Sequence, residues 1–238
     1  MNNKNKWLII GGAILIASAT ILTAYLIVKR RKGNGLIKIK NKNPKKILIV
    51  GDSQSAVETS DGKRITYTYP NVLQNKLSSE GVTIDVLAKG GMPTSWMRAN
   101  LPAKLKSKRY DRVYIYGGGN DTSNMSIKQS TTLKNIQDMV DMSRENGADV
   151  FVNLGYKVQG DFGNYKIMPL TPYLDKREDW IPFVERRKEL QKAIPKNIKN
   201  ANFIMPYDLK SLTSDGIHPN AEGHKIVAEV FYDTIVKR

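Results

Sequence analysis

Two residues in short loops of this chain could together form an activated nucleophile, a serine at position 53 and a histidine at position 218. A serine hydroxyl is a weak nucleophile at neutral pH. It needs a base within hydrogen-bonding distance and donors for the oxyanion that its attack creates. The chain has only two histidines. His218 lies in a loop that stops at a proline, whereas His224 lies in an amphipathic helical stretch, where we expect it on the helix surface. His218 is therefore the predicted base and Ser53 the predicted nucleophile.

The groups that would support this pair occur in similar loops. Asp215 stands three residues before His218, near enough to accept the ring Nδ1 hydrogen and hold the tautomer that presents Nε2 to the serine. An oxyanion hole can be built from the backbone N–H of Ser53, a backbone N–H of Gly90 or Gly91, and the side-chain amide of Asn120. Taken alone, the glycines would also fit a plain loop or a tight turn.

The elements that must position these loops alternate in type. Apolar runs of strand length alternate with stretches of helical period, the pattern of a parallel sheet covered by helices on both faces. The predicted strands are 47–51, 83–88, 112–117, 149–155 and 202–207, and the predicted helices are 70–80, 95–107, 127–146, 179–194 and 221–236. Such an α/β, doubly wound sheet binds ligands outside the carboxyl ends of its strands, where the loops with Ser53, Asn120 and His218 begin. We also expect a helix after Ser53, whose amino terminus would favour negative charge.

Four blocks in this order resemble the SGNH (GDSL-like) hydrolase family: Gly51-Asp52-Ser53, Gly90 or Gly91, Gly119-Asn120-Asp121, and Asp215-Gly216-Ile217-His218-Pro219. The resemblance covers residues 47–238 and implies a flavodoxin-like five-stranded sheet. It also implies ester hydrolysis through an acyl-enzyme, without metal or organic cofactor. It carries over Ser53, Asp215 and His218 as a catalytic triad, and Asn120 with a glycine of the second block as oxyanion donors. One departure is Gln54, where many members have leucine.

A long connection between the fourth strand and the following helix is the predicted substrate wall. Residues 156–180 carry five aromatic side chains among glycines and prolines. Loops of this length near such a site often act as lids or walls, although a packed surface loop would look the same. The predicted substrate contacts are Asp52, Tyr156 and Trp180.

The amino-terminal region has a different composition. Residues 7–28 form an apolar run without a charge, and about 20 such residues cross a hydrocarbon core of about 30 Å. We predict a short polar amino terminus at 1–6, a transmembrane helix at 7–28, a flexible basic tether at 29–46 that contacts anionic headgroups, and a catalytic body at 47–238. A signal peptide cleaved after Ala19 is the alternative. The positive-inside rule favours a cytoplasmic body and a signal anchor an external one, so both sides remain open.

Charge and composition exclude several function classes. The net charge is +16, but residues 1–46 hold eleven of the 38 basic residues and no acidic one, which leaves 27 basic against 22 acidic residues in the body. No nucleic acid is therefore expected as a partner. The absence of cysteine excludes disulfides and thiolate zinc sites. No phosphate-binding loop or zinc-helix motif occurs, so neither a nucleotide nor a metal is expected.

Three functions remain open at this stage. The first is a membrane-anchored esterase that removes acetyl groups from a cell-envelope or surface glycan. The second is a lipid esterase or lysophospholipase acting on the membrane that holds it. The third is a structural or binding membrane protein, for example of a phage virion, that keeps the fold without turnover.

Overall fold

The structure, a computed structural model, describes residues 37–59, 62–156, 177–209 and 217–236. It contains a sheet of five parallel strands in the order β2-β1-β3-β4-β5. The strands are β1 (Lys46–Gly51), β2 (Thr83–Ala88), β3 (Arg112–Tyr116), β4 (Asp149–Asn153) and β5 (Asn202–Ile204). All five predicted strands are confirmed. The last is shorter than expected, because Pro206 has no N–H with which to continue a ladder.

The three central strands are buried on both faces, which explains why apolar residues dominate their sequences. Every residue of β3 and β4 is buried, as is all of β1 except its first residue. Neighbouring side chains enter opposite cores. Leu48 and Val50 pack in one cluster with Val113, whereas Ile47 and Ile49 pack in the other. The central strands therefore hold the sheet rigidly between two apolar layers.

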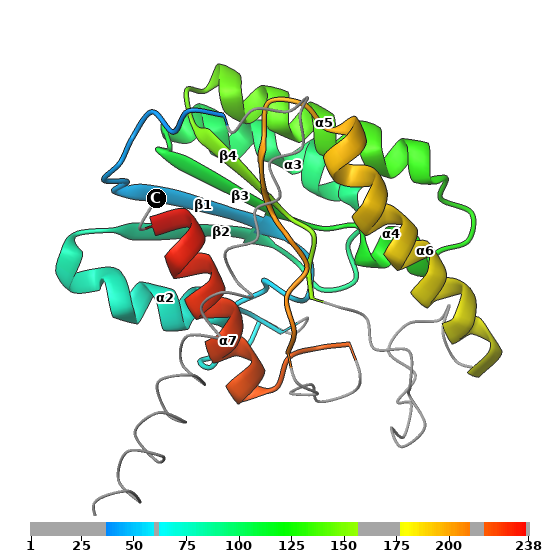
Figure 1. The fold of residues 1–238 in the computed structure, drawn as a ribbon. Coiled ribbons are helices and arrows are strands. Elements are labelled where there is room, and N and C mark those ends of the chain that lie inside the picture. The colour runs from blue at the N-terminus through cyan, green and yellow to red at the C-terminus, as the bar shows by residue number, and fades with distance from the viewer. Residues whose placement is uncertain (1–36, 60–61, 157–176, 210–216, 237–238) are drawn as a thin grey trace, which may run out of the picture. The chain divides into compact units, whose positions relative to one another are not determined.

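Helices cover each face of the sheet (Figure 1). On one side lie α2 (Tyr69–Leu77) and α7 (Ala221–Phe231), and on the other lie α3 (Thr94–Ser107), α4 (Gly119–Ser123), α5 (Gln129–Glu145) and α6 (Arg177–Asn197). The five predicted helices are confirmed, with ends that differ by a few residues. The short α4 was not predicted, and the last predicted helix ends in a π-helical turn at Tyr232–Val236.

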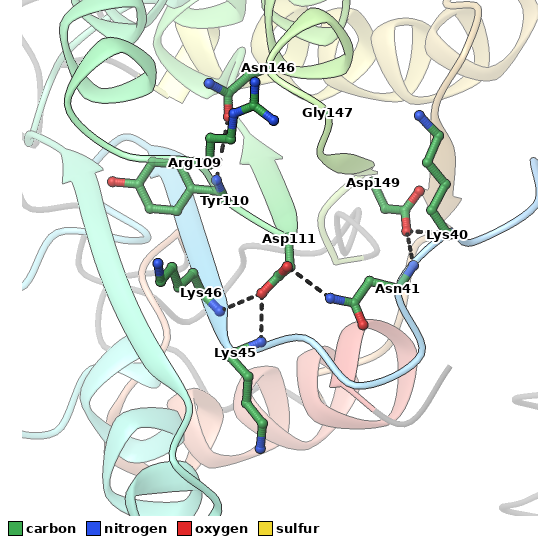
Figure 2. A pocket seen from close by; sticks show the side chains of 10 residues that line it. All are labelled: Lys40, Asn41, Lys45, Lys46, Arg109, Tyr110, Asp111, Asn146, Gly147 and Asp149. Carbon is green, nitrogen blue, oxygen red and sulfur yellow. Dashed lines mark hydrogen bonds between the residues drawn. The ribbon is translucent and has the colours of Figure 1, made fainter.

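Residues 40–46, expected within a flexible tether, are instead fixed to the amino-terminal edge of the sheet. Figure 2 shows how two carboxylates hold them. Asp111 accepts from the backbone N–H groups of Lys45 and Lys46 at 2.7 and 2.9 Å, and from the Asn41 side chain at 2.8 Å. Asp149 accepts from the backbone N–H of Lys40 at 2.8 Å and of Asn41 at 3.2 Å. The prediction failed because a Lys- and Asn-rich sequence does not reveal carboxylates placed 65 and more residues away.

The same segment helps to line a pocket of about 440 Å³. Figure 2 shows Arg109, Asn146 and Gly147 on its other side. Burial alone would raise the pKa of Asp111, but its hydrogen bonds from Lys45, Lys46 and Asn41 lower that pKa below its usual value. This carboxylate is therefore charged at neutral pH.

The run at 7–28 lies outside the described residues. Within the described ranges, no helix is long and apolar enough to cross a membrane.

Candidate active site

The predicted nucleophile and base meet beyond the carboxyl end of β1. Ser53 Oγ lies 2.8 Å from His218 Nε2, a hydrogen bond between residues 165 positions apart. This is the geometry that lets a histidine take the serine proton. The contact was expected from the motif order, whereas the catalytic roles of the two residues stay predictions.

A tight turn holds Ser53 at this place. The Ser55 N–H donates to the Asp52 carbonyl at 3.0 Å, and a Cβ atom on Gly51 would collide with the Ser55 side chain. Residues 53–55 form a turn, and the next helix, α2, begins only at Tyr69. The helix expected after Ser53 is therefore α2, and its amino terminus is not adjacent to the serine in the sequence. The stabilisation of developing charge by that terminus stays a prediction.

His218 reaches Ser53 from the loop before α7. Asn220 caps that helix, since its side-chain oxygen accepts from the Gly223 N–H at 2.9 Å. The cap fixes where the loop ends and so where His218 stands. Asp215, the predicted third member of the triad, lies outside the described residues.

The two glycines of the second block occupy different environments. A Cβ atom on Gly90 would lie 3.8 Å from the Ser53 Cβ, so Gly90 is beside the nucleophile. Gly91 has a φ of +74° and would meet nothing within 4 Å, which makes it the residue that the turn requires. Gly90 is thus the better placed of the two predicted oxyanion donors.

Asn120 lies in the first turn of α4. Its Nδ2 donates to the Met92 carbonyl at 3.1 Å, which ties the third block to the loop that follows Gly91. One N–H of the amide is used in this way, and the other can donate to an oxyanion.

Asp121 connects the loop that follows Gly91 with the loop of Asn120. The motif did not reveal this role. This buried carboxylate accepts from the Thr94 N–H at 2.9 Å and from the hydroxyls of Thr94 and Thr132. The amino terminus of α3, the loop of Asn120 and helix α5 are therefore joined through one side chain.

Asp52 does not fit the predicted substrate contact. It is only 3% exposed, and its Oδ1 accepts from the Gln54 N–H at 3.0 Å. Burial raises the pKa of Asp52, while the Gln54 hydrogen bond and the positive charge of Arg187 oppose that increase. The residue next to the nucleophile therefore supports the turn from inside the protein.

Arg187, on α6, is a buried residue of the site that the sequence reasoning missed. A Cβ atom on Gly119 would lie 3.5 Å from both Arg187 Nη1 and Asp52 Oδ2, so the arginine and the aspartate approach the same loop. Its Nη2 is 3.4 Å from the Tyr116 hydroxyl. The available signal was helical period, because Arg187 shares a face with the buried Leu190 and Ile194.

The other two predicted substrate contacts have different outcomes. Tyr156 is half-buried, and its hydroxyl lies 3.4 Å from Gln54 Nε2, beside the Ser53 turn. Trp180 belongs to α6, but its side chain is outside the described part of the chain. Tyr156 is thus the predicted contact that the structure brings to the site.

His224 is buried, in contrast to the surface position expected for it. It is 6% exposed, stacks on Tyr69, and accepts the Tyr69 N–H at 3.2 Å through Nδ1. Burial, followed by the nearby His218, lowers the pKa of His224 to about 4. The ring is therefore neutral at physiological pH and serves as an acceptor within the core.

Among the described residues, no three histidine, aspartate or glutamate side chains gather as a metal site would require. The chemistry that the described arrangement can perform is proton transfer between Ser53 and His218, with Gly90 beside the serine.

Comparisons with known proteins agree with the fold described above. The model of the GDSL-like Lipase/Acylhydrolase family matches residues 49–226. The crystal structure of TesA is 23% identical, with a TM-score of 0.58, and the alignment covers 80% of this chain and 97% of that one. The psychrotrophic esterase EstA from Pseudoalteromonas sp. is 20% identical, with a TM-score of 0.55 and coverage of 81% and 97%. The acetyl xylan esterase AlAXEase is 16% identical, with a TM-score of 0.57 and coverage of 80% and 99%. At these identities the structures show a shared fold, and no curated protein sequence matches the chain.

Proposed function

The chain belongs to the GDSL-like lipase/acylhydrolase family and is a serine ester hydrolase, and from this premise we propose that Ser53 removes an acetyl group from a cell-envelope or surface glycan. The observation that carries the proposal is the distance of 2.8 Å between Ser53 Oγ and His218 Nε2.

The reaction proceeds in two halves. Ser53 Oγ attacks the ester carbonyl carbon while His218 Nε2 takes the hydroxyl proton. The carbonyl oxygen becomes an oxyanion that accepts from the N–H groups of Ser53 and Gly90 and from the Asn120 amide. The intermediate collapses as His218 returns the proton to the sugar oxygen, which leaves an acetyl-serine. Water then attacks the acetyl carbonyl carbon while His218 takes its proton, and His218 returns that proton to Ser53 Oγ as the acyl bond breaks and acetate leaves.

Asp215 completes the triad in this proposal. From its sequence position we assign it the role of accepting the His218 Nδ1 hydrogen, which fixes the tautomer and stabilises the imidazolium. No cofactor or metal takes part in any step.

The glycan is favoured by the solved structures that share the fold, which include two described as an acetyl xylan esterase and an acetylxylan esterase.

Membrane attachment through residues 7–28, with the flank 29–46 against anionic headgroups, is part of the proposal. It is supported by the uncharged run and by its basic flank. Lys40, Lys45, Lys46 and Arg109 add positive charge around the pocket in Figure 2, at the edge of the body where the flank joins it.

The first test is hydrolysis of p-nitrophenyl acetate by the full chain in detergent, compared with Ser53→Ala. We expect turnover that the substitution abolishes. Retained turnover in the variant would exclude Ser53 as the nucleophile.

The second test separates the substrates. Acetate released from purified peptidoglycan or another acetylated glycan supports the glycan, whereas a preference for long acyl chains over acetyl would transfer the assignment to lipid. Accessibility of the body to protease in intact cells would determine on which side of the membrane it lies.

A further inference from the structure

Gln54, the residue after the nucleophile, makes a second connection between the two catalytic loops. Its side chain is buried, with 7% exposure. Nε2 donates to the Ile217 carbonyl at 3.0 Å and lies 3.4 Å from the Tyr156 hydroxyl. Because a carbonyl can only accept, the orientation of the amide is defined by this bond.

The two connections are adjacent in both loops. Ser53 and Gln54 are consecutive, and so are His218 and Ile217. The Ser53 hydroxyl meets the His218 ring at 2.8 Å, and one residue further the Gln54 amide holds the backbone before that ring. A backbone fixed at Ile217 leaves the imidazole fewer orientations. The backbone N–H of Gln54 also donates to the Asp52 carboxylate, so the backbone that carries the Gln54 side chain is fixed as well.

The Gln54 side chain lowers the stability of the fold through its amide oxygen, an effect that an apolar side chain would not have. Among the described residues, Gln54 Oε1 is buried without a hydrogen-bond partner. A buried, unpaired acceptor typically costs about 1–3 kcal/mol. A leucine or methionine would fill the same space without that cost, so what distinguishes glutamine here is its donor to Ile217.

We propose that Gln54 is a positioning residue that keeps the His218 ring within hydrogen-bonding distance of Ser53 by holding the Ile217 carbonyl. The inference rests on the proposed roles of Ser53 and His218. The bond to the Ile217 carbonyl is the one that acts on the base, whereas the Tyr156 hydroxyl, 3.4 Å from the amide, lies outside the loop of His218.

The test uses Gln54→Met in the full chain, which keeps the length of the side chain and removes the donor. The matched control is Gln74→Met on α2. The Gln74 amide also binds backbone, donating to Val82 and accepting from Ile84 at 3.1 and 2.8 Å, but it lies in another part of the molecule. The readout is the rate of Ser53 labelling by a fluorophosphonate, which reports nucleophilicity without requiring ester turnover.

We expect Gln54→Met to lower the labelling rate about tenfold to a hundredfold, the scale of a misplaced catalytic group, while Gln74→Met leaves it within about twofold. In a His218→Ala background, Gln54→Met should lower the residual rate no further, because the two changes act on one group. Thermal unfolding of the two methionine variants controls for stability.

Two results would overturn the inference alone. One is labelling unchanged in Gln54→Met, and the other is an equal loss with and without His218, which would indicate a general structural effect. Ser53 labelling that responds as expected in a chain without ester turnover would sustain the positioning role and overturn the proposed reaction. Ser53 that resists labelling in the unmodified chain would overturn both.

Discussion

Gly90 lies against Ser53, with 3.8 Å between the Ser53 Cβ and the place of a Cβ on Gly90, while its neighbour Gly91 adopts a left-handed backbone with φ of +74°. Two consecutive glycines thus have separate requirements, one set by the space beside the nucleophile and the other by the turn.

Alanine substitutions should separate these requirements. Gly90→Ala fits by ordinary contact, so we expect stability to change little and ester hydrolysis to fall about tenfold or more, because a methyl group lies beside the reacting serine. Gly91→Ala forces a strained backbone and should cost roughly 1–2 kcal/mol of unfolding free energy. Both urea unfolding and p-nitrophenyl acetate turnover are measured on the two variants. Each variant then serves as the control for the other. Equal losses of stability would contradict the assignment.

The activity should rise with pH through the histidine range. His218 must be neutral to accept the Ser53 proton, and a free histidine has a pKa of about 6.5. The ratio kcat/KM for p-nitrophenyl acetate should therefore increase from pH 5 to 8 and reach a plateau. The same rise should persist in a folded His224→Gln variant, because His224 titrates near 4. A flat profile over this range would remove His218 as the base.

His224 predicts a loss of stability on the acid side. Its pKa is lowered from 6.5 to about 4 in the folded chain, so the unfolded chain binds a proton first as pH falls. The contribution is complete above about pH 6.5 and is lost as pH falls towards 4, by at most about 3 kcal/mol. Since the chain has two histidines, two imidazole signals in an NMR titration can test this. If both titrated near 6.5, the buried neutral ring would be wrong.

Asp121 should matter for folding more than an exposed carboxylate does. Asp121→Ala removes the acceptor of Thr94 and Thr132 and leaves their buried donors unpaired, which should cost about 2–4 kcal/mol. Glu145→Ala, on the exposed side of α5, should change the unfolding free energy by no more than about 0.5 kcal/mol. Comparable values from denaturant unfolding of the two variants would show that Asp121 does not hold the loops together.

The sheet and its helices could be predicted because the pattern depends on burial alone. Strands that are covered on both faces are mostly apolar, and the run at 47–51 shows this directly. The meeting of Ser53 with His218 followed from motif order, since the carboxyl ends of parallel strands share one edge.

What could not be predicted depends on partners far away in the sequence. His224 is polar, and its burial is favoured by the N–H donor and the ring of Tyr69, 155 residues away. Arg186 and Arg187 are chemically identical neighbours on α6, yet Arg186 binds the carbonyls of Thr122 and Asn124 while Arg187 lies beside Asp52 and Tyr116. Helical period favours burial of Arg187, but it does not reveal which groups each arginine contacts.

The attachment of residues 40–46 by Asp111 and Asp149 has a mechanical consequence. Any pull on the chain from its amino-terminal side reaches these carboxylates before it reaches β1. β1 lies between β2 and β3, so force along its axis would have to shear two ladders of hydrogen bonds at once. Tension would thus detach residues 40–46 from the two carboxylates first. The turn of Ser53, at the far end of β1, would bear the force last.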